Sequence, residues 1–384
     1  MGTSLGNYKD INQYRRRKKI KQISLKLGMA AVVLALLFVL LNVLNVFQGN
    51  ELEKVIARKD GTAKDQFPLT IKNEQLTDIQ PVGNSIAILT KSSLLTYSTE
   101  GDKVQSAIHG YTNPVTKEGI RRLLTYDRGG YKFRVDSSAG TVGEVTVDNT
   151  IICADISSTG NVAVVMSYKN FSPVVAVYDT NLKVIYTYSA TKDFTSVSFS
   201  PDGEKLALCS IEIFDGILGA SVYELDIGKK TDARITNVQD ILPLGICYQD
   251  GGHIAVIGKN SLVSVKNSKQ TRLDYKGDLL RFAAAGSGTV LVNQNLEDSS
   301  CVLSVVSPEG KSTAAASVDD EVLDLYTAGG NILFLGKKAL CHYDMNLNPK
   351  SSSAAMDKSC SKVIYTGSAA FLLCGDQIEK KELT

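Results

Sequence analysis

The longest apolar stretch of the chain lies near its N-terminus, at residues 27–47. It reads LGMAAVVLALLFVLLNVLNVF and contains no charged residue. As a helix it would extend about 31 Å, enough to cross a hydrocarbon core of about 30 Å. A cleaved signal peptide has a shorter apolar region that ends in small residues, whereas this run ends in Val46, Phe47 and Gln48. A buried core helix would carry a polar stripe, which this run lacks. We therefore predict an uncleaved transmembrane helix at 27–47.

Beyond residue 66 the pattern changes to short runs of alternating apolar residues, which predict β-strands. These runs occupy residues 85–89, 120–126, 161–167, 205–210, 253–258, 289–294, 331–336 and 369–375. Each follows a turn glycine, and these glycines are Gly83, Gly119, Gly160, Gly203, Gly252, Gly288, Gly330 and Gly367. Their spacing of 36 to 49 residues gives a period near 41. A period of this length in a β-rich sequence is typical of four-stranded propeller blades.

We therefore expect an all-β fold, a β-propeller over residues 67–384, with eight blades favoured and seven possible if one irregular unit is split. Sheets packed radially cover one another's faces and protect their edges, which a lone sheet cannot do. The last unit, from residue 362, has room for only three strands, so residues 67–71 (FPLTI) are predicted to close the ring. A pair of β-sandwiches is the alternative, and it does not explain the period.

Charge is distributed unevenly and predicts the orientation in the membrane. Residues 1–47 hold eight Lys and Arg and one acid, for a formal charge of +7, while the remainder carries −5. Positive charge before the apolar segment places the N-terminus in the cytoplasm. We predict a basic cytoplasmic tail (1–26), the membrane helix (27–47), a polar stalk (48–66) and an extracytoplasmic propeller (67–384). An acidic main domain argues against nucleic acid as a partner.

The basic tail contains a cluster that we expect to contact anionic lipid headgroups. Its members are Arg15, Arg16, Arg17, Lys18 and Lys19. Each such charge contributes about 1 kcal/mol near an anionic membrane surface. Docking of a cytoplasmic protein on the tail is the alternative.

One unit of the repeat resembles a known class of blade. Residues 199–203 (FSPDG), followed by the strand at 205–210, resemble the WD40-like and quinoprotein-like propeller repeats. The basic tail, the apolar segment and the propeller with residues 126–130 (YDRGG) together resemble an uncharacterised family of single-pass membrane proteins from low-GC Gram-positive bacteria. The resemblance implies an extracytoplasmic propeller and no particular activity. The chain has no Trp, so the tryptophan motif of quinoprotein blades is absent and we expect no cofactor.

The three histidines do not form a metal-binding motif. His109, His253 and His342 are far apart in sequence, and none belongs to a spacing such as HExxH. We therefore expect no metal.

Seven cysteines occur without a CxxC pair. Cys153, Cys209 and Cys374 sit in apolar runs, where a thiol packs as a small hydrophobic group. We expect mostly buried free thiols, with a disulfide between neighbouring blades, near Cys209 and Cys247, as the alternative.

The most basic part of the propeller holds Arg121, Arg122, Arg128 and Arg134. Together they could bind an anionic envelope polymer, although solvated strand ends are the simpler interpretation. No GxSxG motif and no phosphate-binding loop at a strand-to-helix junction occurs. The sequence thus offers no catalytic residues.

The absence of catalytic and cofactor motifs favours a non-catalytic, membrane-anchored scaffold or recognition module of the cell envelope. Membrane lipid and an envelope protein are its expected partners. A receptor that relays an external ligand to a cytoplasmic partner is one alternative. An enzyme that acts on envelope glycans is the other, and carboxylates clustered at one channel mouth would favour it.

Overall fold

The computed structural model describes residues 66–383 except 73, 168–173, 191, 230–231, 296–299, 352–353, 356–357 and 368. The predicted tail, membrane helix and nearly all of the stalk lie outside the described residues and stay predictions. Within the described part, no helix has the length and hydrophobicity needed to cross a membrane.

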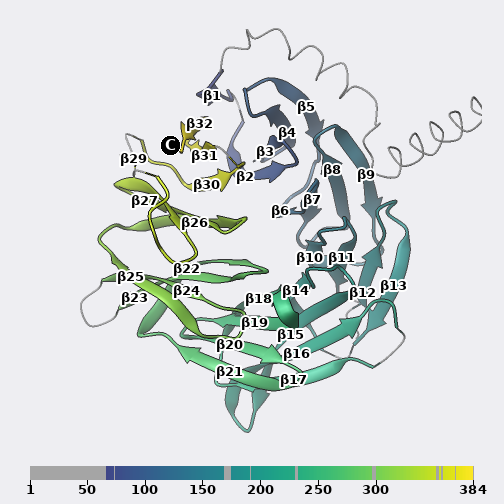
Figure 1. The fold of residues 1–384 in the computed structure, drawn as a ribbon. Helices are drawn as coiled ribbons and strands as arrows, with labels where there is room; N and C mark the ends of the chain where they lie inside the picture. The colour runs from purple at the N-terminus through teal and green to yellow at the C-terminus, as the bar shows by residue number, and fades with distance from the viewer. Residues whose placement is uncertain are drawn as a thin grey trace, which may run out of the picture. The chain divides into compact units, whose positions relative to one another are not determined.

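The described residues form eight four-stranded antiparallel sheets, so the favoured count of eight blades is confirmed. The sheets follow one another as the blades of a propeller (Figure 1). Blade 1 consists of β2 (Leu76–Val82), β3 (Ser85–Thr90), β4 (Ser93–Ser98) and β5 (Lys103–Ile108), and blade 2 consists of β6 (Pro114–Glu118), β7 (Arg122–Asp127), β8 (Lys132–Ser137) and β9 (Gly140–Thr146). Blade 3 consists of β10 (Ile151–Ile156), β11 (Val162–Met166), β12 (Val174–Tyr178) and β13 (Val184–Ser189), and blade 4 consists of β14 (Phe194–Phe199), β15 (Lys205–Phe214), β16 (Ile217–Asp226) and β17 (Arg234–Gln239).

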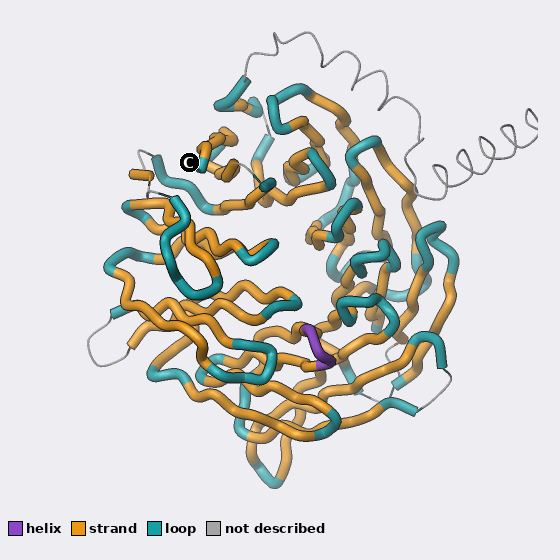
Figure 2. Tube along the Cα trace, in the orientation of Figure 1, coloured by secondary structure: helices purple, strands orange, loops and turns teal. Residues whose placement is uncertain are grey.

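Blades 5 to 8 complete the ring. Blade 5 consists of β18 (Pro243–Gln249), β19 (His253–Gly258), β20 (Ser261–Lys266) and β21 (Lys269–Asp274), and blade 6 consists of β22 (Gly277–Ala285), β23 (Gly288–Asn295), β24 (Cys301–Val306) and β25 (Ser312–Val318). Blade 7 consists of β26 (Val322–Ala328), β27 (Asn331–Gly336), β28 (Ala339–Asp344) and β29 (Ala354–Ala355), and blade 8 consists of β30 (Lys362–Tyr365), β31 (Ala369–Cys374), β32 (Gln377–Glu382) and β1 (Leu69–Thr70). The single 3₁₀ turn of the described part, Asp250–Gly252, joins β18 to β19 and is purple in Figure 2.

The two ends of the propeller share blade 8, as the sequence predicted. β1 pairs antiparallel with β32, with Leu69 opposite Ile378 and Thr70 opposite Gln377. The ring of Phe67 also meets the buried ring of Phe371 edge to face, at 5.2 Å between centroids. The predicted closing strand at 67–71 is therefore confirmed, with β1 as its paired part.

The hydrophobic core is divided among the interfaces between blades. Each cluster of buried apolar residues in the described chain lies between two neighbouring sheets. β11 shows the cause: Val162 and Val164 pack toward blade 2, whereas Ala163 and Val165 pack toward blade 4. Successive side chains of a strand point to opposite faces. The second strand of a blade has both faces covered, so it is mostly apolar, and β11 is apolar at every position.

Hydrogen bonds from inner-strand side chains tie neighbouring blades together around the central axis. In several blades, a polar side chain of the first strand bonds to the first strand of the next blade. The pairs are Thr116 Oγ1 to Asp78 Oδ2 (2.5 Å), Phe199 N to Asp155 Oδ2 (2.9 Å), Tyr248 N to Ser198 Oγ (3.0 Å), Arg281 Nε to Leu323 O (3.2 Å) and Val363 N to Asp324 Oδ2 (3.0 Å). These bonds satisfy buried polar groups that the packed interfaces would otherwise leave without partners.

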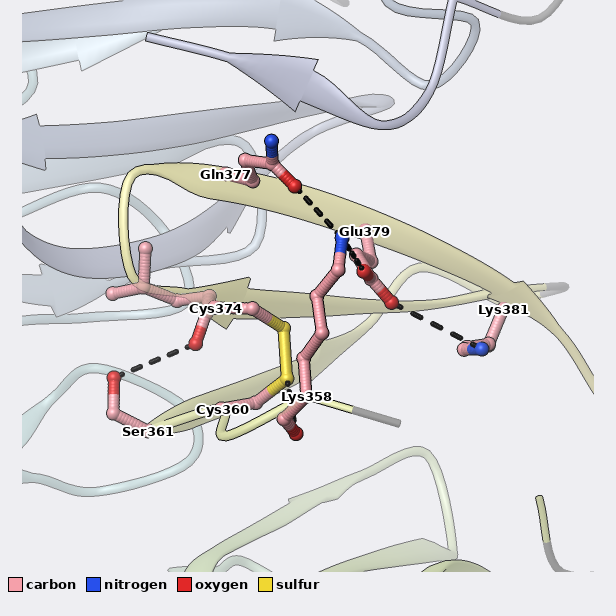
Figure 3. The surroundings of a disulfide bond; sticks show 8 residues. Lys358, Cys360, Ser361, Cys374, Gln377, Glu379 and Lys381 are labelled. Atoms are coloured by element: carbon pink, nitrogen blue, oxygen red, sulfur yellow. Dashed lines mark hydrogen bonds and ion pairs between the residues drawn. A yellow bond between two sulfur atoms is a disulfide. The ribbon is translucent and has the colours of Figure 1, made fainter. Parts of the chain in front are cut away.

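A disulfide joins Cys360, just before β30, to Cys374 at the end of β31 (Figure 3). The same region holds a main-chain bond from Ser361 N to Leu373 O (2.8 Å) and an ion pair between Lys358 and Glu379 (2.8 Å). The prediction that Cys374 packs as a free thiol is therefore wrong. The structure instead brings it next to Cys360, because the hairpin from β30 to β31 returns the chain to the same end of blade 8.

The other cysteines of the described chain are free, and Cys153 and Cys209 are buried as predicted. Burial raises the pKa of each of these two thiols to about 12. The alternative of a disulfide between Cys209 and Cys247 is wrong, since both thiols are free.

Candidate functional site

The propeller has two faces, which we distinguish by the turns they carry. Face A carries the turns after the first and third strands of each blade. Face B carries the hairpins between second and third strands and the connections from one blade to the next. The described chain begins on face A, because Gln66 bonds to Glu100 O through its main-chain N (3.0 Å) and to Asp102 through its side chain (2.9 Å). Both partners lie in the turn between β4 and β5.

A long hairpin extends from face B at blade 4. β15 and β16 have ten residues each and pair along their whole length, from Lys205 opposite Asp226 to Phe214 opposite Ile217. β14 pairs with β15 only as far as Ser210. The end of the hairpin therefore continues beyond its blade, as the narrow loop at the bottom of Figure 1 shows.

The turn of this hairpin is built by Asp215 and Gly216, which have φ values of 50° and 84°. Two consecutive residues with positive φ match the twist of the flanking strands, and Asp-Gly is a favoured pair for such a turn. Residues 211–218 (IEIFDGIL) carry this signal. The predicted strand ended at residue 210, so the extension was not predicted.

The extension exposes large apolar side chains. Ile213 is 72% exposed, and Ile211, Ile217 and Leu218 are each at least 40% exposed. Ile213 lies opposite Leu218 in the register, so the two share a face of the hairpin. The same face, farther back along β15 and β16, packs against blade 5 through Cys209 and Ala220. The exposed residues thus continue a buried face into solvent.

Apolar exposure continues from the hairpin onto blade 5 and blade 6. Ile241 N donates to Leu218 O (3.3 Å), which places the connection between blades 4 and 5 against the hairpin. Leu242 in that connection and Leu244 at the start of β18 are 41% and 51% exposed. Next along β18, a Cβ at Gly245 would come within 2.9 Å of the ring of Phe282, which is 36% exposed. We call the set Ile211, Ile213, Leu218, Leu242, Leu244 and Phe282 the apolar surface.

A second feature lies on the central axis. The Tyr326 hydroxyl of blade 7 donates to the Glu118 carboxylate of blade 2, at 3.1 and 3.0 Å from its two oxygens. These blades are not neighbours, since blades 8 and 1 lie between them. Glu118 keeps contact with solvent. Partial desolvation by the surrounding inner strands raises the pKa of its carboxyl to about 7, although the Tyr326 hydrogen bond opposes the shift. The pair bridges the axis near face A, where β6 ends.

The inner strands also contribute Asp155 and Asp324, whose pKa values are raised by burial. Both carboxylates accept main-chain hydrogen bonds from the next blade, from Phe199 and Val363. They serve the contacts between blades and do not form a cluster at one mouth. Within the described residues, no group of three or more His, Cys, Asp or Glu side chains is arranged to hold a metal ion.

The structure separates the four arginines predicted as an anion-binding patch. Arg121 precedes β7 on face A, whereas Arg128 follows β7 on face B. Arg122 donates from Nη1 to Thr180 O of blade 3 (2.7 Å). Arg134 is 4% exposed and forms a two-pronged ion pair with Asp136, at 2.7 and 2.6 Å. The four side chains are thus not brought together, and their binding of an envelope polymer stays a prediction.

The predicted lipid contacts of Arg15, Arg16, Arg17, Lys18 and Lys19 lie outside the described residues. The strand expected at 120–126 begins at Arg122, and Ile120 is 69% exposed in the turn before it.

Solved structures of diverse origin have similar folds. BamB from Moraxella catarrhalis matches with a TM-score of 0.52 at 10% identity, over 83% of this chain and all of that chain. Sqt1 from Saccharomyces cerevisiae matches with a TM-score of 0.58 at 8% identity, over 82% of this chain and 98% of that chain. AztD from Citrobacter koseri matches with a TM-score of 0.50 at 11% identity, over 74% of this chain and 86% of that chain. At these identities the likeness shows the fold alone.

No curated protein matches the sequence of the chain. One family model does match, over residues 64–381, which is nearly the whole propeller. The chain therefore belongs to the family of unknown function DUF5711.

Proposed function

We propose that the chain is a membrane-anchored, non-catalytic recognition module of the cell envelope, which binds a partner protein through the apolar surface on face B. The observation that carries this proposal is the hairpin of β15 and β16. Its outer part contributes nothing to the pairing of the ring, yet it holds Ile213 at 72% exposure with Leu218 beside it.

Exposed apolar side chains that adjoin one another are unusual on a protein that acts alone. Covering them would contribute about 25 cal/mol for each Å² of apolar area removed from water. The hairpin presents Ile213 and Leu218 on a rigid, fully hydrogen-bonded ribbon. Preorganised side chains of this kind lose little entropy on association. The rigid geometry of the hairpin and its exposed apolar side chains therefore both suit a protein-binding surface.

Two observations support an envelope location. The apolar segment at 27–47, preceded by basic residues, is expected to act as an anchor with the propeller outside. The disulfide between Cys360 and Cys374 is a bond that persists in oxidising compartments and is rare in the cytosol.

The experiment is cross-linked co-purification of the full chain from native membranes. We expect a stoichiometric envelope protein with the wild-type chain, and its loss from the variant that combines Ile213→Asp and Leu244→Asp. Ile235→Asp is the matched control, because Ile235 is 51% exposed on β17, on the side of blade 4 that faces blade 3. A partner that survives the double substitution, or one lost equally with the control, would contradict the proposal.

A further inference from the structure

A cleft of about 820 Å³ opens on face B between blades 6 and 7. Its walls come from the middle of β22, the ends of β23 and β25, the start of β24, the connection into β26 and the turn between β27 and β28. They include the apolar residues Leu280, Val318 and Val322. A volume of this size suits a small organic ligand. We propose that the cleft is a binding site for a small anionic ligand, whose carboxylate or phosphate group is held by Arg281.

The guanidinium of Arg281 is held in place without a counter-charge. Its Nε donates to Leu323 O (3.2 Å) and its Nη1 donates to Leu280 O (2.9 Å), and both acceptors are main-chain carbonyls. In the described part of the chain, its Nη2 forms no hydrogen bond and no carboxylate lies within 4.0 Å of its nitrogens. A guanidinium oriented in this way is prepared for an external anion, since its planar donors match carboxylate and phosphate oxygens.

The acidic residues in the wall of the cleft are engaged elsewhere. Asp320 accepts hydrogen bonds from the main-chain N atoms of Glu321 (2.8 Å), Lys338 (2.9 Å) and Ala339 (3.1 Å). Glu321 forms an ion pair with Lys337 (3.2 Å), and Asp319 faces Lys338 (3.7 Å). None of these carboxylates neutralises Arg281, so its charge is available to a ligand.

Other arginines of the described chain show that a counter-charge is common here. Arg134 is paired with Asp136, Arg234 with Glu224 (2.8 Å) and Arg272 with Asp274 (2.7 Å). Arg281 differs from these three in having no carboxylate partner among the described residues and in lining a cleft. The apolar part of the wall would accommodate the body of the ligand.

The test measures anion binding to the full chain in detergent by titration calorimetry. The probes are succinate and glycerol phosphate, each compared with sodium chloride at equal ionic strength because surface charge effects are screened by salt. We expect saturable binding of at least one probe to the wild-type chain. Arg281→Gln should weaken it about tenfold or more, as loss of hydrogen bonds to a charged group does. Arg281→Lys should retain part of the affinity.

Arg272→Gln is the matched control, since it removes an arginine that already has a carboxylate partner, and it should bind as the wild type does. Stronger binding of succinate would identify the source as a carboxylate ligand, and stronger binding of glycerol phosphate would identify a phosphate ligand. The proposal is overturned if neither probe binds the wild type beyond chloride, or if Arg281→Gln binds equally well. The unfolding temperature of Arg281→Gln without anion checks that the variant is folded. Capture of a protein partner by the apolar surface is a separate result and does not affect this one.

Discussion

Reduction of the Cys360–Cys374 disulfide should lower the free energy of unfolding of the propeller by about 3 kcal/mol. The bond closes a loop whose ends are 14 residues apart. The chain-entropy relation gives about 3 kcal/mol for a loop of about 15 residues, because the cross-link restricts the unfolded chain. The effect concerns the whole ring, since blade 8 is the blade that both ends of the propeller build.

Urea unfolding followed by tyrosine fluorescence measures this effect, because the chain has 16 Tyr and no Trp. The wild-type chain is compared with and without a reductant. The variant that combines Cys360→Ala and Cys374→Ala is the reference, and reductant should leave its unfolding unchanged. Cys209→Ala is the control for loss of a buried free thiol, and it should keep the full response to reductant. Equal stability of the oxidised and reduced wild-type chain would refute the reasoning.

Three further changes test the packing and the axis, each by urea unfolding. Asp136→Ala should lower the free energy of unfolding by about 3–5 kcal/mol, because it leaves Arg134 buried without its ionic partner. Replacement of both residues by apolar ones should recover most of the loss. A loss below about 1 kcal/mol for the single change would contradict the burial argument. Phe371→Ala should cost about 3–5 kcal/mol, since the ring is fully buried between blade 8 and blade 1; an exposed control such as Ile120→Ala should cost far less. The raised pKa of Glu118, about 7 against an ordinary 4.5, means that the folded chain binds more protons than the unfolded chain between these values. Its contribution to stability therefore falls as pH rises from about 4.5 to about 7 and levels off above, and Glu118→Gln should remove that fall; an unchanged pH profile would show that Glu118 titrates normally.

The blade count and the closing strand could be predicted from the sequence because both depend on local signals. Turn glycines such as Gly203 and Gly330 recur with the blade period and have positive φ in the structure, at 75° each. The last unit lacked a fourth strand, and residues 67–71 were apolar and extended, so the missing strand could be assigned. The period can be read in the sequence because the second strand of each blade is buried on both faces and forms a recognisable apolar run.

The site could not be predicted because it depends on which distant residues meet. Arg121 and Arg128 are seven positions apart, but a β-strand between them sends one to face A and the other to face B. Arg281 looks ordinary in sequence, and only the packing of β22 against β26 shows that its bonds go to carbonyls. The disulfide was missed for the same reason, since the spacing of Cys360 and Cys374 gives no sign that a hairpin brings them together.

Closure of blade 8 by β1 sets an order of events during synthesis. Leu69 is made early, but its partner Ile378 emerges only after roughly 300 more residues, which takes roughly 15 to 60 s at typical translation rates. Until then, blades 1 to 7 can stack one after another, while the first and last of them each keep an uncovered apolar face and β1 has no partner. A nascent chain that is stalled or truncated before β32 would therefore be an open array of blades with an exposed apolar face at each end. Such partly folded chains are expected to aggregate or to need a chaperone.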